Sequence, residues 1–323
     1  MLHGVHGDHW VQRTKRVHTE VYGPIDCSQP GITSITAITV ITAITAPTSH
    51  HPHHRYHCHH RYHFQSIPMP SIFLTGSTDG LGRAAAATLI AEGHQVVLHA
   101  RSKQRADALT DLAPKAAGIA IGDLSSASDT RSIAEQVNKI GRMDAVIHNA
   151  GVYHLSDRGK TPEGHATTLA VNTLAPYMLT ALIERPDRLI YMSSGMHRDG
   201  SASLDDIDWQ KRRWDADAAY SDSKLYVTAL VLALARRWPK VLSNAVNPGW
   251  VPTKMGGASA PDDLEQGHLT QTWLAVSNDP AALTSGGYWQ HRKRQHPAAA
   301  ATKSEFQDAL IDKLAQMTGV RLE

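Results

Sequence analysis

The octapeptide Thr75-Gly76-Ser77-Thr78-Asp79-Gly80-Leu81-Gly82 decides the fold of this chain. It follows an apolar run, residues 71–75, that suits a buried strand, and it leads into an alanine-rich segment, residues 80–93, that is typical of a helix. At such a turn, glycines spaced G-x3-G-x-G let the backbone approach a pyrophosphate held at the helix N-terminus. The motif predicts a dinucleotide-binding unit, and a plain tight turn is the alternative interpretation.

The end of the next expected strand, residues 95–99, indicates which dinucleotide fits. NAD-specific sites carry an acidic residue there, about 20 residues after the glycines, to bind the ribose 2′-hydroxyl. This chain has His99-Ala100-Arg101 instead, and Arg83 directly follows the last glycine. Two guanidinium groups suit a 2′-phosphate, so the sequence predicts NADP(H). Ordinary solvated arginines are the alternative.

Strands and helices alternate along the rest of the chain. We expect strands at residues 117–121, 144–148, 188–193 and 241–246, and helices at residues 126–140, 163–182 and 216–238. This order predicts an α/β fold, a Rossmann-like, doubly wound parallel sheet that forms a single domain over residues 69–323. Ligands of such sheets bind beyond the C-terminal ends of the strands.

The main body of the chain, residues 69–323, is electrically balanced. The first 68 residues hold 5 of the 32 basic and 3 of the 30 acidic residues, so the net charge of +2 belongs to them. A balanced body has no charge excess that would bind nucleic acid or an anionic membrane. It also lacks cysteine and any apolar run of about 18 or more residues. We therefore expect one large cytoplasmic domain that does not span a membrane.

Residues 1–68 differ in composition from the body. They contain 12 of the 21 histidines and both cysteines, and residues 32–46 repeat Ile-Thr-x with a period of three. Residues 49–63 hold eight histidines and Cys58 without the ligand spacing of a structural zinc site. We expect a disordered or non-native extension and no functional metal. Metal binding by the histidine tract and a true start at Met69 are the alternatives.

A tyrosine and a lysine stand four residues apart at the start of the second long helix, in Tyr220-Ser221-Asp222-Ser223-Lys224. This spacing puts both side chains on one helix face. A nearby ammonium favours phenolate and lowers the tyrosine pKa, which makes Tyr220 a candidate acid or base near neutral pH. Taken alone, the pair could equally be a chance surface arrangement.

Further polar residues accompany this pair. Ser193-Ser194 follows the strand predicted at residues 188–193, where a hydroxyl could bind a carbonyl oxygen. Asn172 lies on the preceding helix, and the turn at residues 247–253, NPGWVPT, could wall one face of a nicotinamide. In this order the motifs resemble the short-chain dehydrogenase/reductase family, from Pro70 to the C-terminus. The resemblance implies a hydride-transferring oxidoreductase.

The resemblance also implies roles for individual residues. Ser194 would polarise a carbonyl, Tyr220 would donate or accept the proton, and Asn172 would hold a water of the proton relay. Lys224 would bind the ribose hydroxyls and lower the tyrosine pKa. The predicted cofactor-binding residues are Gly76, Ser77, Thr78, Gly80, Leu81, Gly82, Arg83, Arg101, Asp123, Leu124, Asn149, Ala150, Gly151, Pro248, Gly249, Val251 and Thr253. Among these, Asp123 would contact adenine and Thr253 the carboxamide.

The chain departs from the family pattern at two points. His148 stands where the usual NNAG motif begins with asparagine, and Ser194 is chosen over Ser193 by its place in the pattern. The 25 residues between Ser194 and Tyr220, the turn at residues 248–253 and the ending GGYWQ…LAQMTG resemble the branch of retinol dehydrogenase-like and protochlorophyllide reductase-like enzymes.

Substrate selection is expected from residues 152–162, 196–219 and 250–285. These segments hold Trp209, Trp214, Trp250 and Trp273, which either line an apolar pocket or serve ordinary packing. Glycines and a proline mark residues 254–262 as a candidate lid.

The sequence therefore predicts an NADP(H)-dependent oxidoreductase acting on a small carbonyl or alcohol. The alternatives are a catalytically silent NADP-binding regulator, a double-bond reductase or epimerase on the same scaffold, and a metal-binding protein defined by residues 1–68. From the resemblance we also expect a homodimer or homotetramer built through residues 163–182 and 216–238.

Overall fold

The computed structural model describes residues 69–323, and the expectations for residues 1–68 lie outside this part of the chain. The strands are β1 (Ser71–Leu74), β2 (Gln95–Ala100), β3 (Gly118–Ile121), β4 (Ala145–His148), β5 (Arg188–Met192), β6 (Leu242–Val246), β7 (Gly287–Gln290) and β8 (Lys293–Gln295). The α-helices are α1 (Gly80–Ala91), α2 (Lys103–Asp107), α3 (Ala127–Ile140), α4 (Thr167–Leu169), α5 (Ala175–Leu182), α6 (Ala216–Arg237), α7 (Leu264–Val276) and α8 (Ser304–Thr318). Short 3₁₀ turns are η1 (Ala113–Lys115), η3 (Gly195–Asp199) and η4 (Ala299–Thr302), and η2 (Ala170–Leu174) is a π-helical turn.

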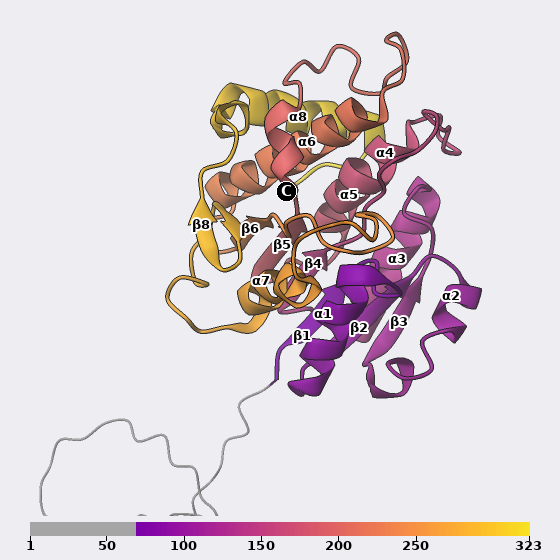
Figure 1. Cartoon of the computed structure of the whole chain (residues 1–323), viewed down its shortest axis with the longest axis vertical. Coiled ribbons are helices and arrows are strands. Elements are labelled where there is room, and N and C mark those ends of the chain that lie inside the picture. The colour runs from indigo at the N-terminus through magenta and orange to yellow at the C-terminus, as the bar shows by residue number, and fades with distance from the viewer. Residues whose placement is uncertain (1–68) are drawn as a thin grey trace, which may run out of the picture. The chain divides into compact units, whose positions relative to one another are not determined.

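The strands form one sheet in the order β3-β2-β1-β4-β5-β6-β7-β8 (Figure 1). Strands β1 to β7 all run parallel to one another, which confirms the predicted doubly wound sheet. Only β8, at the edge beside β7, is antiparallel. The β7–β8 hairpin turns through His291 and Arg292, with φ of 49° and 59°, as a type I′ turn requires. The strand order reverses between β1 and β4, and ligands of open α/β sheets bind at such a point.

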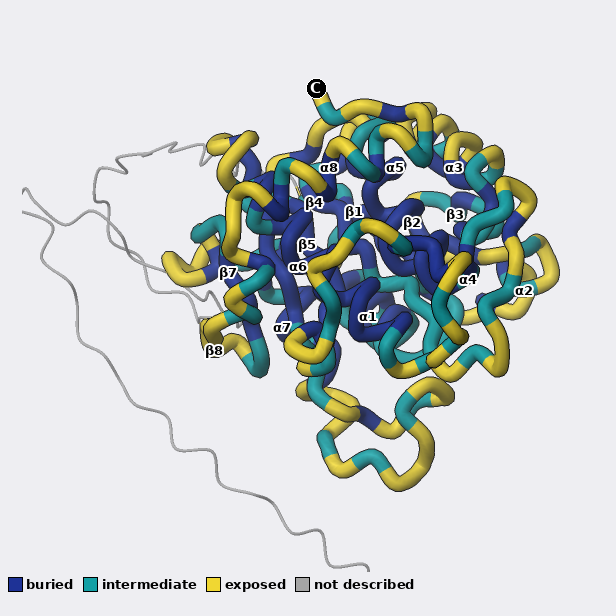
Figure 2. The backbone as a smooth tube through the Cα atoms, turned by 90° about the horizontal axis from the view of Figure 1, so that it is seen from above, coloured by how far each residue is buried: buried dark blue, intermediate teal, exposed yellow. Residues whose placement is uncertain are grey.

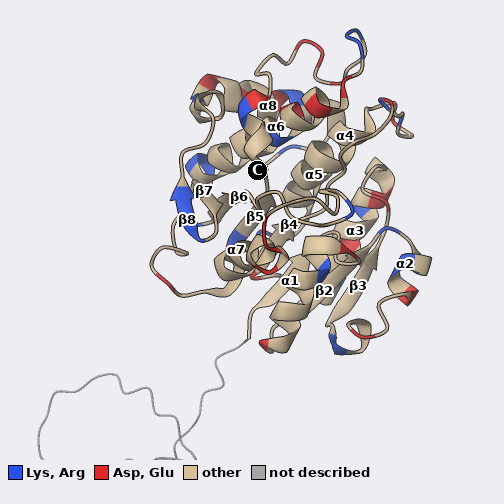
Figure 3. Cartoon of the chain, in the orientation of Figure 1, with Lys and Arg blue, Asp and Glu red and all other residues tan. Residues whose placement is uncertain are grey.

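Helices cover both faces of the sheet because its strands are apolar on both faces. Ile72 and Leu74 of β1 pack with α1 and α7, whereas Phe73 between them packs on the opposite face with α3, α5 and α6. The sheet lies at the centre of the buried backbone in Figure 2. The outer surface is polar, and Figure 3 shows acidic and basic residues interspersed over it, with β8 strongly basic.

The prediction of one regular helix over residues 163–182 is wrong in two respects: the helix begins later, and it is interrupted. Residues 161–165 form a turn in which Gly164 has φ of +90°, and helix starts only at Thr167. A π-helical turn then interrupts it, with the N–H of Ala175 bonded to the carbonyl of Ala170. Pro176 follows this turn and has no N–H to continue a regular ladder.

The C-terminal segment covers part of α5 and α6. Helix α8 packs against α6, and beyond it the Tyr177 hydroxyl donates a hydrogen bond of 2.9 Å to the carbonyl of Val320. The indole of Trp238 donates another, also of 2.9 Å, to the carbonyl of Glu323. Self-association through these helices remains a prediction, and the chain's own C-terminus occupies part of the surface it would use. No helix within residues 69–323 has the length and apolar character that a bilayer span needs.

Candidate active site

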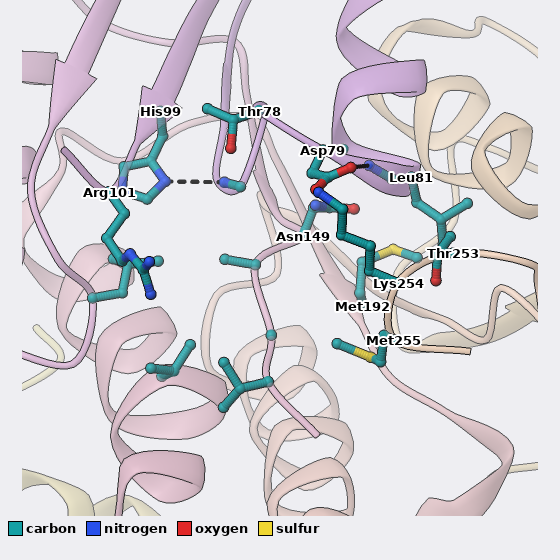
Figure 4. A pocket seen from close by; sticks show the side chains of 18 of the residues that line it. Thr78, Asp79, Leu81, His99, Arg101, Asn149, Met192, Thr253, Lys254 and Met255 are labelled. Atoms are coloured by element: carbon teal, nitrogen blue, oxygen red, sulfur yellow. Dashed lines mark hydrogen bonds and ion pairs between the residues drawn. The ribbon is translucent and has the colours of Figure 1, made fainter. Parts of the chain in front are cut away.

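A cavity of about 400 Å³ opens at the C-terminal edge of the parallel strands, and segments that follow β1 to β6 all contribute to its lining. Figure 4 shows the part nearest the glycine loop. The predicted site residues that line it are Gly76, Thr78, Gly80, Leu81, Gly82, Arg101, Asp123, Leu124, Asn149, Ala150, Gly151, Tyr220, Lys224, Pro248 and Thr253. The predicted residues outside the lining are Ser77, Arg83, Asn172, Ser194, Gly249 and Val251.

Close packing explains the glycines of the loop. A Cβ atom at Gly82 would lie 2.2 Å from the carbonyl oxygen of Gly76 and 2.3 Å from Nδ2 of Asn149. Gly76 has a left-handed φ of +70°, and a Cβ there would lie 3.0 Å from Cα of Ala150. The loop is therefore pressed against the end of β4, and the N-terminus of α1, with its free N–H groups, faces the cavity.

His99 joins the ends of three strands, a role that the sequence analysis missed. Its Nδ1 accepts a hydrogen bond of 3.0 Å from the N–H of Gly76, so Nε2 carries the hydrogen and donates it, at 3.0 Å, to the carbonyl of Gly122. Burial lowers the pKa of His99, in keeping with a neutral ring. Ser77 belongs to the same network, because its hydroxyl accepts the N–H of His99 and points away from the cavity.

The basic residues at this end differ from the predicted pair. Arg83 forms an ion pair of 2.6 Å with Asp111 and does not line the cavity. Arg101 does line it, and Arg105 donates a hydrogen bond of 3.1 Å to the hydroxyl of Thr78 on the glycine loop. Arg105 was missed, although its position four residues after Arg101, in a helix that begins at Lys103, was a usable signal.

The glycine loop also contacts the segment after β6. Lys254 forms an ion pair with Asp79, and this contact lowers the pKa of Asp79 (Figure 4). Met255 lines the cavity next to it. The first two residues of the predicted lid, residues 254–262, therefore line the cavity beside the glycine loop.

The Asn149 side chain is hydrogen-bonded to other parts of the fold. Its Nδ2 donates a hydrogen bond of 3.1 Å to the carbonyl of Thr75, and its Oδ1 accepts one of 3.3 Å from Gln271 of α7. Its backbone N–H bonds to the hydroxyl of Thr75, at 2.9 Å. The residue thus ties β4 to β1 and α7, and this geometry does not need its side chain to face a ligand.

Tyr220 and Lys224 lie together at the other end of the cavity, on α6. Lys224 Nζ lies 5.4 Å from the centroid of the Tyr220 ring and donates a hydrogen bond of 2.7 Å to the carbonyl of Met192. Burial lowers the pKa of Lys224 to about 8. Burial also raises the pKa of Tyr220 to about 12, although a hydrogen bond with Ser194 acts in the opposite direction.

The expectation that Lys224 brings the Tyr220 pKa toward neutrality does not hold for the protein by itself. Both groups lie in a region of low polarity, where loss of hydration disfavours the charged form of each. The lysine ammonium is directed to the Met192 carbonyl, and the phenol is bonded to a serine hydroxyl. Tyr220 is accordingly a neutral phenol with a proton to donate.

Only one of the two serines after β5 has a hydroxyl near Tyr220. The Ser193 hydroxyl is buried against α6, 2.7 Å from the hydroxyl of Thr228. Ser194 lies beside Tyr220 and acts to lower its pKa, and the Ser194 Oγ accepts the N–H of Met196 at 3.2 Å. Because that N–H is the donor, the bond to Met196 leaves the hydroxyl hydrogen of Ser194 available for the phenol oxygen of Tyr220 or, in its place, for a substrate oxygen.

Asn172 lies on the π-helical turn and connects two elements of the site. Its Oδ1 accepts the N–H of Val152 at 2.8 Å, and its Nδ2 donates to the hydroxyl of Ser223 at 3.0 Å. The side chain therefore links the segment after β4 to α6, one residue before Lys224.

Comparisons with known proteins match this arrangement. A family model described as enoyl-(acyl carrier protein) reductase matches residues 76–282. The chain is 40% identical over 257 residues to short-chain dehydrogenase chry4 of Gibberella zeae, which covers 79% of this chain and 99% of the relative. The chain belongs to the short-chain dehydrogenase/reductase family.

A more distant relative and a solved structure are also similar to this chain. Human retinol dehydrogenase 13 is 28% identical over 287 residues, covering 79% of this chain and 86% of the relative. A blue fluorescent protein from a metagenomic library, solved in complex with NADPH, has a TM-score of 0.57 at 20% identity over 70% of this chain and 97% of the other. The second comparison shows the shared fold.

Tyr153 is the aromatic residue that this short-chain dehydrogenase/reductase places beside Tyr220. The two ring centroids are 4.2 Å apart, and the Tyr153 hydroxyl donates a hydrogen bond of 2.7 Å to Asp217 in the first turn of α6. His154, with a left-handed φ of 54°, stacks on Tyr153 at 3.5 Å. These contacts hold the beginning of segment 152–162 against the Tyr220 ring.

The four tryptophans in the predicted substrate segments do not line the cavity. Trp209 and Trp214 pack edge to face, with centroids 5.5 Å apart, and Trp273 packs in the same way on Trp289. Trp250 is exposed. Packing is thus the interpretation that fits three of them. Within residues 69–323, no three His, Cys, Asp or Glu side chains are grouped as metal ligands would be.

Proposed function

We propose that this protein is an NADP(H)-dependent oxidoreductase that interconverts a carbonyl and an alcohol. The observation that carries the proposal is the contact between Ser194 and Tyr220 beside Lys224, at the end of a cavity whose other end is the glycine loop. A serine hydroxyl and a protonated phenol next to each other suit a carbonyl oxygen, which needs a hydrogen-bond donor and then a proton.

The cavity fits a dinucleotide. The tight contact of Gly82 with Gly76 leaves room at the α1 N-terminus that side chains would fill, and its N–H groups suit a pyrophosphate. Arg101, which lines the cavity, would pair with a 2′-phosphate. Arg105 would assist it from the glycine loop, where it is bonded to Thr78 and lies 3.6 Å from Asp79, whereas Arg83 is paired with Asp111. The structural neighbour solved with NADPH supports a nicotinamide cofactor. Bound here, the nicotinamide would supply the hydride.

In the proposed reduction, the residues of the chain bind and protonate the substrate. Ser194 donates its hydroxyl hydrogen to the carbonyl oxygen, and Tyr220 passes its phenolic proton to the same oxygen as negative charge develops there. The high pKa of Tyr220 keeps the phenol protonated before the reaction. Lys224 supplies a positive charge near the phenolate that remains.

A second candidate is reduction of a carbon–carbon double bond, because the matching family model is described as an enoyl reductase. The two reactions differ in where the proton goes, to oxygen in one and to carbon in the other. The adjacent hydroxyl groups of Ser194 and Tyr220 favour the carbonyl reaction, because a carbonyl oxygen can accept a hydrogen bond from each of them, whereas a carbon atom cannot.

The test is a substrate panel of ketones, aldehydes and enones, followed by loss of NADPH absorbance, with NADH as control. We expect reduction of ketones or aldehydes, and near-complete loss of turnover in Tyr220→Phe with NADPH still bound. Turnover of enones alone would support the second candidate. Substantial activity of Tyr220→Phe would show that the proton has another source.

A further inference from the structure

His197 lies behind Ser194 with both ring nitrogens bonded. It belongs to η3, directly after β5, and is fully buried. Its Nε2 accepts the N–H of Ala298 at 2.9 Å, and its Nδ1 lies 2.7 Å from the carbonyl oxygen of Ser194. A backbone N–H can only donate, so Nε2 carries the lone pair and Nδ1 carries the hydrogen. The ring therefore donates a hydrogen bond to the Ser194 carbonyl.

Tyr288 donates a second hydrogen bond to the same carbonyl. It extends from β7, and its hydroxyl lies 3.1 Å from the Ser194 oxygen. The rings of His197 and Tyr288 contact each other, with centroids 4.6 Å apart. Both side chains are buried, so neither hydrogen bond competes strongly with water.

Hydrogen bonds hold the backbone on both sides of Ser194. On its N-terminal side the N–H of Ser193 bonds to the carbonyl of Val246 at 2.7 Å, as part of the sheet. On its C-terminal side the chain has left the sheet, and the two side-chain donors join the backbone N–H of His197, which donates to the same Ser194 carbonyl at 3.2 Å. The direction of the Ser194 Cα–Cβ bond, and so the position of Oγ next to Tyr220, depends on this anchoring.

We propose that His197 and Tyr288 are positioning residues that fix the Ser194 hydroxyl for the carbonyl oxygen of the substrate. The inference rests on the proposed function, and it adds residues from η3 and β7 to the site. Neither side chain needs to touch the substrate or the cofactor, because both act through the backbone of Ser194. Burial lowers the pKa of His197, which agrees with a neutral ring of fixed tautomer.

Two substitutions at His197 separate its two hydrogen bonds. In His197→Asn, the side-chain N–H₂ can take the place of Nδ1 and keep the bond to Ser194. In His197→Gln, the longer side chain can take the place of Nε2 and keep only the bond to Ala298. We expect kcat to fall about tenfold or more in His197→Gln and clearly less in His197→Asn, with KM and the NADPH Kd changed less than about twofold in both.

Tyr288→Phe removes the second donor without changing the ring. We expect a fall in kcat of about three- to tenfold with an unchanged Kd for NADPH. Tyr226→Phe is the matched control, because this buried tyrosine hydroxyl lies 3.4 Å from the carbonyl of Ser203 instead of Ser194, and its kcat should stay at the wild-type value. Melting temperatures of all variants report separately on folding.

The background of Ser194→Ala provides the decisive comparison. If His197 and Tyr288 act through Ser194, adding His197→Gln or Tyr288→Phe to Ser194→Ala should lower kcat no further. Equal losses in both backgrounds would overturn the inference, as would His197→Asn losing as much kcat as His197→Gln.

A measurement without turnover keeps the inference apart from the proposed function. The ¹⁵N spectrum of the His197 ring at neutral pH should show the neutral form with hydrogen on Nδ1. An imidazolium or an Nε2–H ring would overturn the inference even in an active enzyme. A wild type that reduces no carbonyl would overturn the proposed function, and the ring tautomer would then decide whether His197 holds Ser194.

Discussion

Arg105 donates a hydrogen bond of 3.1 Å to the hydroxyl of Thr78, which connects the start of α2 to the glycine loop. Arg101, four residues earlier in the chain, lines the cavity. Arg83 is paired with Asp111 and does not line it. The positive charge that would select NADP(H) is therefore built from the segment after β2.

Alanine substitutions of these arginines test the cofactor assignment. Arg101→Ala and Arg105→Ala should each raise the Kd of NADPH by about tenfold or more and change the Kd of NADH little, because a charge-assisted bond to the 2′-phosphate is lost. Arg83→Ala is the control and should bind NADPH like the wild type. Fluorescence titration of NADPH measures all three. Large effects at Arg83 and Arg101, with none at Arg105, would restore the sequence-based prediction.

The two serines after β5 should respond oppositely to substitution by alanine. Ser194→Ala should lower kcat by about 10²- to 10³-fold with little change in melting temperature, since it removes the donor next to Tyr220. Ser193→Ala should retain most activity and lose stability, because it leaves the buried Thr228 hydroxyl without its partner at 2.7 Å. Steady-state kinetics and thermal unfolding measured on both variants separate the roles. Loss of activity in Ser193→Ala alone would reverse the assignment.

His148 makes the fold sensitive to acid. It is fully buried beside Thr180, and burial lowers its pKa to about 3, against about 6.5 in an unfolded chain. The stability it provides is complete above pH 6.5 and is lost as the pH falls toward 3, because only the unfolded chain takes up the proton. At pH 5 this loss is about 2 kcal/mol. The free energy of unfolding of His148→Asn should therefore fall less between pH 7 and pH 5, and an equal fall would contradict the account.

Buried Lys224 should make the protein less stable at neutral pH than at alkaline pH. Its pKa is lowered to about 8, while an unfolded lysine titrates near 10.5, so the stability of the wild type rises as the pH increases between these values. Lys224→Met lacks this contribution. Its melting temperature relative to the wild type should be higher at pH 7 than at pH 9.5. A difference that does not change with pH would mean that the fold does not lower the pKa of Lys224.

The elements that depend on local pattern could be predicted from the sequence. Apolar runs of four to six residues bounded by glycine or polar residues gave β1 to β6 within one or two residues, and the glycine loop was placed correctly between β1 and α1. The interruption near Asn172 could not be predicted in the same way. An apolar helical pattern does not show that helix begins after Gly164 or that a π-helical turn precedes Pro176.

Local order along the chain therefore determined the family motifs, the alternation of strands and helices, and the pairing of Tyr220 with Lys224, because periodicity and short spacing are properties of neighbouring residues. The tertiary structure decided how similar side chains are used: Arg105 is bonded to the glycine loop whereas Arg83 is paired with Asp111, and Ser194 lies beside Tyr220 whereas the Ser193 hydroxyl is bonded to Thr228. It also decided that Tyr220 is a neutral phenol, since hydration, and with it the pKa, is lost only when distant segments such as Tyr153 close over the ring.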